Sequence, residues 1–310
     1  MGFDTRLLTG EEWISFSLRA LYREYGYSLY RMSKFEEYDF YARNKDYLIS
    51  DNVITFTDAG GKLMALKPDV TLSLVRACRD PEGEAVRKLC YNETVYRVPR
   101  HGNAFRELTQ AGIECIGAVG DAEIAETLSL AARSLERVSF GAEWRLSVSH
   151  LGILTEMLER TGLPPAQRRA ALKCVEQKNP HELERLCARC GADGAATAGL
   201  LALLRLTGPA QTVLPELRRL EGDSAALSQL ERVTAQLGTG AQLDFSIVSD
   251  LNYYNGVVFH GYVSGVPAAV LSGGQYDQLM QKLGRASRAI GFAVYVDLLE
   301  RLAGDGEVEA

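Results

Sequence analysis

The chain lacks the features that mark membrane-spanning, secreted and dedicated nucleic-acid-binding proteins. Among its 310 residues, no apolar run approaches the roughly 20 residues of a membrane span, and the N-terminal MGFDTRLLTGEEW lacks the basic-then-apolar pattern of a signal peptide. Arg6 stands where a myristoylation signal would place Ser or Thr. The formal net charge of -6 argues mildly against a nucleic-acid-binding protein, although a local basic patch can coexist with an acidic total.

Cysteines are also few. The six are scattered without a disulfide framework, which favours a reducing cytoplasm, so we expect a cytoplasmic protein with no membrane partner. Three of them and one histidine could be imagined as a zinc site: Cys174, His181, Cys187 and Cys190. Their spacing matches no familiar zinc finger, all four fall in predicted helices, and packing explains a cysteine equally well. We therefore expect no metal.

The most informative stretch runs from residue 91 to residue 117, YNETVYRVPRHGNAFRELTQAGIECIG. β-forming residues end at a basic loop that contains Pro99 and Gly102, and a second strand follows. Alternation places Gln110 and Glu114 on one face of that strand and small apolar side chains on the other. Inward-facing polar groups need partners, and a bound ligand is one kind of partner.

The residues before this stretch predict a helix, a short strand and a hairpin. Thr9 to Glu12 has the form of a capping box before an amphipathic helix, and residues 27–31 follow as a strand. Two β-rich runs, 53–57 and 63–66, flank a Gly-Gly turn. Asp69 then precedes a helix, where it is explained equally well as an N-cap or as a ligand-binding acid.

Beyond the central stretch, the predicted secondary structure changes twice, first to short helices and then back to strands. Asp121 is predicted to cap a helix, and an alternating strand begins at Trp144. In residues 151–237 the strand signals vanish, and Gly- and Pro-containing breakers separate short helices. Strand signals return at Leu243, which we expect to open a strand extending to Ile247.

The last part of the chain predicts strands joined by short turns. Residues 272–277 are expected to form a glycine loop, 289–294 a buried strand and 297–302 a helix. Because short turns cannot join parallel strands, the predicted fold is α+β, an antiparallel sheet flanked by helices. We assign residues 1–150 and 238–310 to this core and residues 151–237 to an all-helical insertion subdomain.

Several of these motifs resemble one family. The run R-x-x-P-R-x-G followed by F-R-E-L-T-Q-A-G-I-E resembles motif 2 of class II aminoacyl-tRNA synthetases, in the form carried by histidyl-tRNA synthetase. The segment TFTDAGGKLMALKPDVT is similar to the one whose acid and threonine hold the amino group of histidine. The resemblance covers nearly the whole chain. It implies the class II synthetase core and a helical insertion. Histidyl-tRNA synthetases continue after this core into an anticodon-binding domain, which we expect this chain to lack, so tRNA is not an expected partner.

The same resemblance implies a dimer and a histidine site. The first helix and strand correspond to motif 1, a homodimer interface, although Met32 follows Arg31 where a proline is usual; a helix on its own core explains the pattern equally well. The implied histidine-binding residues are Asp69, Thr71, Arg97, Gln110, Glu114, Tyr253 and Tyr254. Glu114 and a tyrosine would hold the imidazole, Asp69 and Gln110 the ammonium, and Arg97 or backbone amides the carboxylate. Asp69 is shorter than the usual acid, and Asn252 replaces an aspartate.

Against the family pattern, the departures fall on the nucleotide side. Leu298 stands for an arginine of motif 3, Ser249 and Gln275 stand for further arginines, and Val98 stands for an acid. Adenylate formation needs cations near the phosphates, and losing one preorganised donor typically costs roughly 3–4 kcal/mol. We therefore expect little synthetase activity.

This combination resembles the regulatory subunits of ATP phosphoribosyltransferase. Membership would imply a subunit that is not an enzyme by itself and has no cofactor. It would pair with a short-form catalytic subunit for the first step of histidine biosynthesis and would take histidine as regulatory ligand. A homodimer within a mixed octamer is also implied. Two alternatives stay open: a truncated synthetase that still adenylates or transfers an amino acid, and a stand-alone amino-acid sensor with another partner.

Overall fold

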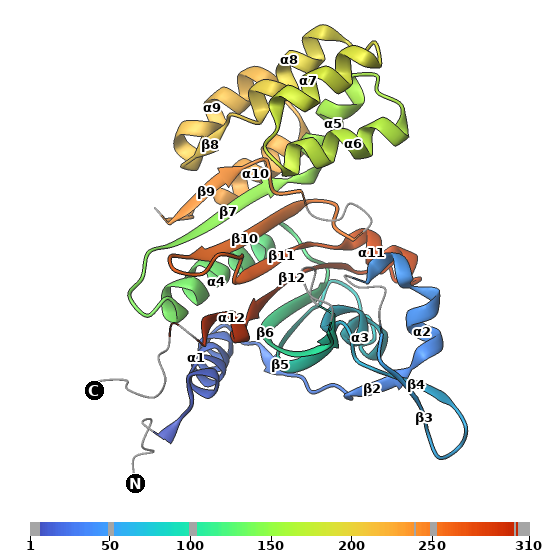
Figure 1. Cartoon of the computed structure of the whole chain (residues 1–310). Helices are drawn as coiled ribbons and strands as arrows, with labels where there is room; N and C mark the ends of the chain where they lie inside the picture. Colours follow the sequence, from blue (N-terminus) through green and yellow to red (C-terminus); the bar gives the residue numbers. More distant parts are fainter. Residues whose placement is uncertain are drawn as a thin grey trace.

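The computed structural model describes residues 7–48, 53–98, 104–238, 240–248, 253–300 and 302 (Figure 1). Within these ranges, nine strands form one large sheet in the order β1-β5-β6-β12-β11-β10-β7-β9-β8. In chain order these strands are β1 (Ser28–Leu29), β5 (Val86–Arg97), β6 (Arg106–Gly117), β7 (Trp144–His150), β8 (Thr207–Gly208), β9 (Ala241–Asp244), β10 (Val257–Val263), β11 (Leu271–Gln275) and β12 (Arg288–Tyr295).

The central pairings of this sheet are antiparallel, from β5 through β6, β12, β11 and β10 to β7, which confirms the predicted α+β fold. Two pairings near the edges differ from the prediction, since β1 runs parallel to β5 and β9 parallel to β7. In both cases the partner strands are separated by long connections that contain other elements, so the short-turn argument does not apply to them.

A smaller sheet, in the order β2-β4-β3, lies at the opposite end of the molecule from helices α6 to α9 (Figure 1). Its strands are β2 (Phe35–Glu37), β3 (Thr55–Thr57) and β4 (Leu63–Leu66). The predicted hairpin is confirmed: Asp58 Oδ1 accepts hydrogen bonds from the backbone N–H of Gly60 and of Lys62, and Gly61 has a φ of 81° that suits glycine.

Helices lie on both faces of the large sheet (Figure 1). They are α1 (Gly10–Glu24), α2 (Tyr38–Arg43), α3 (Val70–Ala77), α4 (Asp121–Val138), α5 (Leu151–Arg160), α6 (Pro165–Glu176), α7 (Pro180–Arg189), α8 (Gly194–Leu203), α9 (Ala210–Glu221), α10 (Ala225–Thr234), α11 (Asp277–Lys282) and α12 (Val296–Leu299), with a 3-10 turn at Lys45–Tyr47. In the described ranges, none of these helices combines the length and apolar composition that crossing a bilayer requires.

The sequence predicted N-terminal caps for two helices, at Thr9 and at Asp121. The capping box of α1 is confirmed, because Thr9 Oγ1 accepts from Glu12 N and Thr9 N donates to Glu12 Oε2. The predicted cap of α4 is wrong by one residue. Asp121 is the first helical residue and Gly120 is the N-cap, with its N–H donating to Glu123 Oε2 at 2.8 Å.

Residues 151–237 hold helices α5 to α10, but they are not purely helical. Thr207 and Gly208 form β8, which pairs with Asp244 and Leu243 of β9 at the edge of the large sheet. β9 ends at Asp244, so the strand expected to reach Ile247 is shorter than predicted. The division of the chain into a core and an insertion subdomain stays a prediction.

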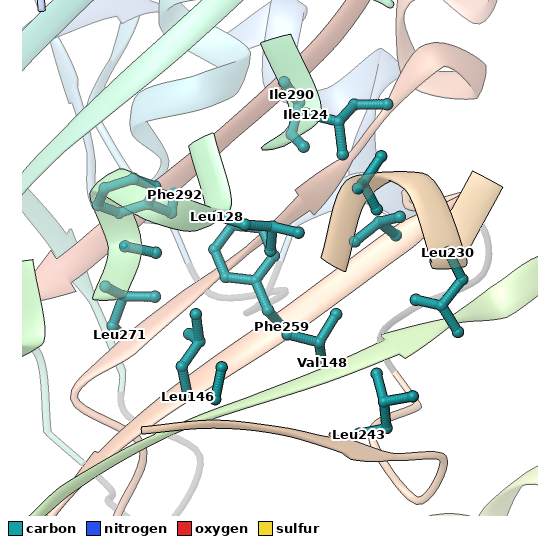
Figure 2. Close-up of a cluster of buried hydrophobic side chains, with 14 of the residues drawn as sticks. Ile124, Leu128, Leu146, Val148, Leu230, Leu243, Phe259, Leu271, Ile290 and Phe292 are labelled. Atoms are coloured by element: carbon teal, nitrogen blue, oxygen red, sulfur yellow. The ribbon is translucent and has the colours of Figure 1, made fainter. Parts of the chain in front are cut away.

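The main apolar core lies between the large sheet and helices α1, α4 and α10. In Figure 2, Ile124 and Leu128 of α4 lie near Phe259 of β10 and Val148 of β7. The side chains of these four residues are fully buried. Burying an aliphatic or aromatic side chain of this size stabilises the fold by about 1.5–3 kcal/mol. This face of the sheet is therefore devoted to packing.

The predicted glycine loop at residues 272–277 is wrong, because Leu271–Gln275 form the central strand β11. At Gly273 an added Cβ would lie 2.4 Å from the carbonyl oxygen of Gly291 and 2.4 Å from Cβ of Phe292. The glycine is required by the close approach of a neighbouring strand rather than by a turn.

Candidate functional site

The candidate site lies on the face of the large sheet opposite the main core. Along β6, Ala111, Ile113 and Cys115 belong to that core, and the alternate residues Gln110 and Glu114 point to the other face. Both polar residues are nonetheless buried, with 5% and 1% of their surfaces exposed. The predicted alternation is confirmed, and it brings a carboxyl group to the middle of the molecule.

Glycines in the neighbouring strands leave room for the side chains of the site. Gly291 of β12 lies opposite Glu114, and an added Cβ there would come within 1.8 Å of Glu114 Oε2. Gly274 of β11 is paired with Gly291, and its added Cβ would lie 2.8 Å from the ring of Tyr254. Glu114 and Tyr254 therefore lie directly against bare sheet backbone.

Glu114 is the centre of the hydrogen-bonding in this region. Thr71 Oγ1 donates to Glu114 Oε1 at 2.7 Å, and Tyr276 Oη donates to Oε2 at 2.6 Å. Burial raises the pKa of Glu114 to about 7, against the opposite effect of these two hydrogen bonds, and the nearby charge of Asp69 adds to the rise. The carboxyl group keeps acceptor positions for a ligand N–H.

Asp69 is the N-cap of α3, as one of the two interpretations predicted. Its Oδ1 accepts from Leu72 N at 2.9 Å, and its backbone carbonyl accepts from Ser73 Oγ at 2.8 Å. Burial raises the pKa of Asp69, while the Leu72 N–H and the charge of Arg97 oppose the rise. A carboxylate has about four acceptor positions, so capping does not prevent Asp69 from binding an ammonium group.

Arg97 ends strand β5 and is 7% exposed. Its positive charge opposes the rise in pKa that burial causes at Asp69 and at Asp297. A buried guanidinium close to two acids is suited to bind a carboxylate, because it offers a planar set of donors that carboxylate oxygens match.

The tyrosines close the site on the side of Thr71. The ring centroids of Tyr253 and Tyr254 are 4.6 Å apart, and Tyr253 and Tyr276 are 6.0 Å apart. Thr71 partly opposes the rise in pKa that burial causes at Tyr253. Burial raises the pKa of each of these three tyrosines, so their hydroxyls stay protonated and can donate.

The structure thus places the seven predicted residues on one face of the sheet. Asp69, Thr71 and the two tyrosines lie near Glu114, whereas Arg97 is paired with Arg106 at the end of β5 and interacts with Asp69. That this cluster binds histidine stays a prediction. Tyr276 and the buried Lys67 belong to the same region and were missed. The only signal for Tyr276 was its place at the end of the glycine run, and its partner Glu114 is 162 residues away in the sequence.

On the predicted nucleotide side, the residues that depart from the family pattern make structural contacts. Gln275 is 1% exposed and its Oε1 accepts from Val257 N at 2.8 Å. Leu298 is partly buried against the main core, and Val98 is also partly buried. The predictions for Ser249, Asn252 and the motif-2 loop at residues 99–103 lie outside the described residues.

The candidate zinc ligands do not converge. Cys174 and Cys187 belong to the main core, whereas Cys190 is exposed at the end of α7. Across the described part of the chain, no group of three or more His, Cys, Asp or Glu side chains is arranged to hold a metal ion.

Comparisons with known proteins agree with this geometry. The family model for histidyl-tRNA synthetase matches residues 8–299. Curated relatives called ATP phosphoribosyltransferase regulatory subunit include one from Symbiobacterium thermophilum, 31% identical, where the match covers 80% of this chain and 64% of the relative. Another, from Anaeromyxobacter sp. (strain Fw109-5), is 33% identical over 94% of this chain and 89% of the relative. The chain thus spans just under two thirds of the first and most of the second.

Solved structures show the same fold. An ATP phosphoribosyltransferase regulatory subunit/histidyl-tRNA synthetase from Bacillus halodurans C superposes with a TM-score of 0.81 at 24% identity, covering 95% of this chain and 79% of that one. The ATP phosphoribosyl transferase (HisG:HisZ) complex from Thermotoga maritima contains a chain with a TM-score of 0.73 at 17% identity, with 95% of this chain and 98% of that chain covered.

Proposed function

The chain belongs to the histidyl-tRNA synthetase family and, within it, to the ATP phosphoribosyltransferase regulatory subunits, and from this membership we propose that it serves the first step of histidine biosynthesis as a regulatory subunit. It binds histidine at the site around Glu114 and reports its concentration to a catalytic subunit. It has no catalytic activity by itself and needs no cofactor.

One contrast within the site supports this proposal most strongly. The groups that suit an amino acid, among them Asp69, Arg97 and Glu114, are all buried on this face of the sheet, whereas Gln275 and Leu298, which by the family resemblance replace arginines, hydrogen-bond to the backbone and pack against the core. Charge develops on the phosphates in that reaction, and a site without preorganised donors stabilises it poorly. The site is therefore suited to hold an amino acid rather than to activate it.

The proposed partners follow from the same membership. The chain pairs with a short-form catalytic ATP phosphoribosyltransferase, dimerises through α1 and β1, and assembles with that partner into a mixed octamer in the cytoplasm. Histidine binding would be coupled to the partner's active site by about 1–3 kcal/mol, as in most allosteric proteins. By reciprocity, the catalytic subunit would change the affinity for histidine by the same factor.

Reconstitution of the two subunits tests this function. We expect phosphoribosyl transfer by the catalytic subunit to rise when this chain is added and to fall when L-histidine is then supplied. Calorimetry on this chain should detect histidine binding, and histidine-dependent ATP–pyrophosphate exchange should be absent. Brisk exchange on the chain alone would instead support the synthetase-like enzyme, and histidine binding without any effect on the transferase would support a sensor with another partner.

A further inference from the structure

A buried ion pair lies next to the candidate site. It takes part neither in the capping of α3 nor in the hydrogen bonds of Glu114. Lys67 directly follows β4 and is fully buried, and its Nζ contacts Glu93 Oε2 of β5 at 2.5 Å. The Glu93 side chain is 11% exposed, and its Oε1 accepts from Met32 N at 3.0 Å. The pair therefore joins three segments of the chain.

Such a pair is not explained by stability alone. Removing an ammonium and a carboxylate from water costs free energy that their attraction often fails to recover, so apolar residues of similar size commonly serve as well or better. A buried ion pair can instead serve to fix one particular arrangement of the segments that it joins.

The segments in question carry the two ends of the candidate site. Lys67 lies two residues before Asp69, with the rigid Pro68 between them. Its backbone carbonyl accepts from Tyr96 N at 2.9 Å, and Tyr96 directly precedes Arg97. Its backbone N–H donates to Lys34 O at 2.9 Å. Lys67 is thus fixed through its backbone and its side chain.

Glu93 extends this connection across the sheet. In the register of β5 and β6 it lies directly opposite Gln110, which is itself on the site face. The ion pair consequently ties the residue before the Asp69 turn to the strand position beside Gln110. These two residues, Asp69 and Gln110, are the ones assigned to a ligand ammonium group.

We infer that Lys67 and Glu93 are positioning residues that hold Asp69 in place for the ammonium group of the bound amino acid. The inference rests on the proposed function, since it concerns the same ligand. It identifies two residues outside the predicted site whose effect is confined to one end of the ligand. Glu114, which is assigned to the imidazole, is held by Tyr276 as well as by Thr71, so one of its two contacts does not depend on α3.

The test compares two ligands on one variant. Lys67→Met combined with Glu93→Gln removes both charges together, so that neither partner is left buried and unpaired. The amide oxygen that Glu93→Gln introduces would still accept from Met32 N. Calorimetry measures L-histidine and 3-(imidazol-4-yl)propionate, which keeps the imidazole and the carboxylate but lacks the amino group. We expect histidine affinity to fall roughly three- to thirtyfold, the usual effect of residues that act through others, and the affinity of the amine-free ligand to stay unchanged.

A matched control removes a charged pair elsewhere. Arg160 and Glu221 form a bidentate pair between α5 and α9, and the Glu221 side chain is fully buried. Arg160→Met with Glu221→Gln should leave both affinities as in the wild type. Should the Lys67/Glu93 double variant not fold, Glu93→Asp keeps the charge but shortens its reach, and the same selective weakening is expected.

Three results would overturn the inference. Equal weakening of both ligands would mean that the pair only supports the fold. Unchanged affinity for both would mean that the pair does not position Asp69. If the wild-type chain binds neither ligand, the proposed histidine site fails, and this inference fails with it; the first two results leave the proposed function intact.

Discussion

On the face of the large sheet that packs against α4, strand β6 presents Ala111, Ile113 and Cys115, whereas on the opposite face it presents Gln110 and Glu114. Both sets of side chains are buried. The first face gains free energy from apolar burial, and the second carries polar groups whose burial costs free energy unless partners compensate it. The comparison separates the part of the molecule that makes the fold stable from the part that must serve a ligand.

The sharpest way to test this comparison is to truncate one residue on each face of the same strand. Ile113→Ala should lower the free energy of unfolding by about 2–5 kcal/mol, because it leaves a cavity in the core. Histidine affinity of the folded protein should stay unchanged. Urea denaturation and calorimetry measure the two quantities.

The counterpart is Gln110→Ala, three residues earlier on the opposite face. We expect it to change stability little and to weaken histidine binding, because it removes an amide assigned to the ammonium group. If Gln110→Ala instead lowers stability as much as Ile113→Ala and leaves histidine affinity untouched, the second face is a structural core as well.

The next largest effect concerns the pH dependence of stability at Glu114. Its pKa in the folded protein is raised from the ordinary 4.5 to about 7, so the folded state holds the proton more tightly than the unfolded state between these values. The resulting stabilisation is fully present below about pH 4.5 and is lost as the pH rises through about 7. Its size is at most about 3 kcal/mol.

A variant isolates this contribution. Glu114→Gln cannot titrate, so from about pH 5 to about pH 8 the wild type should lose stability relative to the variant. Urea denaturation at both pH values measures the difference, and the other titrating groups cancel in the comparison. Parallel stability curves for the two proteins would show that Glu114 is not protonated in the folded state near neutral pH.

A smaller effect is expected where a glycine makes room for the site. At Gly291 an added Cβ would lie 1.8 Å from Glu114 Oε2, so Gly291→Ala must displace the carboxyl group. We expect a loss of stability of about 1–3 kcal/mol, as for other overpacked positions, together with loss of measurable histidine binding. At Gly194 nothing lies within 4 Å of an added Cβ, so Gly194→Ala is the control and should leave histidine binding unchanged.

The same residues show how much of the fold could be predicted from the sequence. The Thr9 capping box, the hairpin at Asp58 and the alternation along β6 are local patterns, and each was predicted correctly. The strand at Leu271–Gln275 was mistaken for a loop because its glycines are required by the close approach of a neighbouring strand rather than by a turn. Information of this kind is not local in the sequence.

The same limit applies to the site. The seven predicted residues came from a family resemblance, and spacing alone would not have joined Thr71 to Glu114. Tyr276 donates to a carboxyl group 162 residues away, and Lys67 meets Glu93 across 26 residues. Such pairs are set by the tertiary packing of segments that are distant in the chain, which a single sequence does not reveal.

A last prediction separates the two roles of Asp69. Asp69→Asn keeps an oxygen that can accept from Leu72 N, so the cap of α3 and the stability of the protein should change little. The substitution removes the negative charge, and a hydrogen bond to a charged group contributes about 1.5–3 kcal/mol, so histidine affinity should fall at least tenfold. Asp193 caps α8 in the same way, through Ala196 N, and Asp193→Asn is the matched control. Equal histidine affinities for both variants and the wild type would mean that Asp69 is only a cap, and the ammonium end of the site would have to lie elsewhere on this face of the sheet.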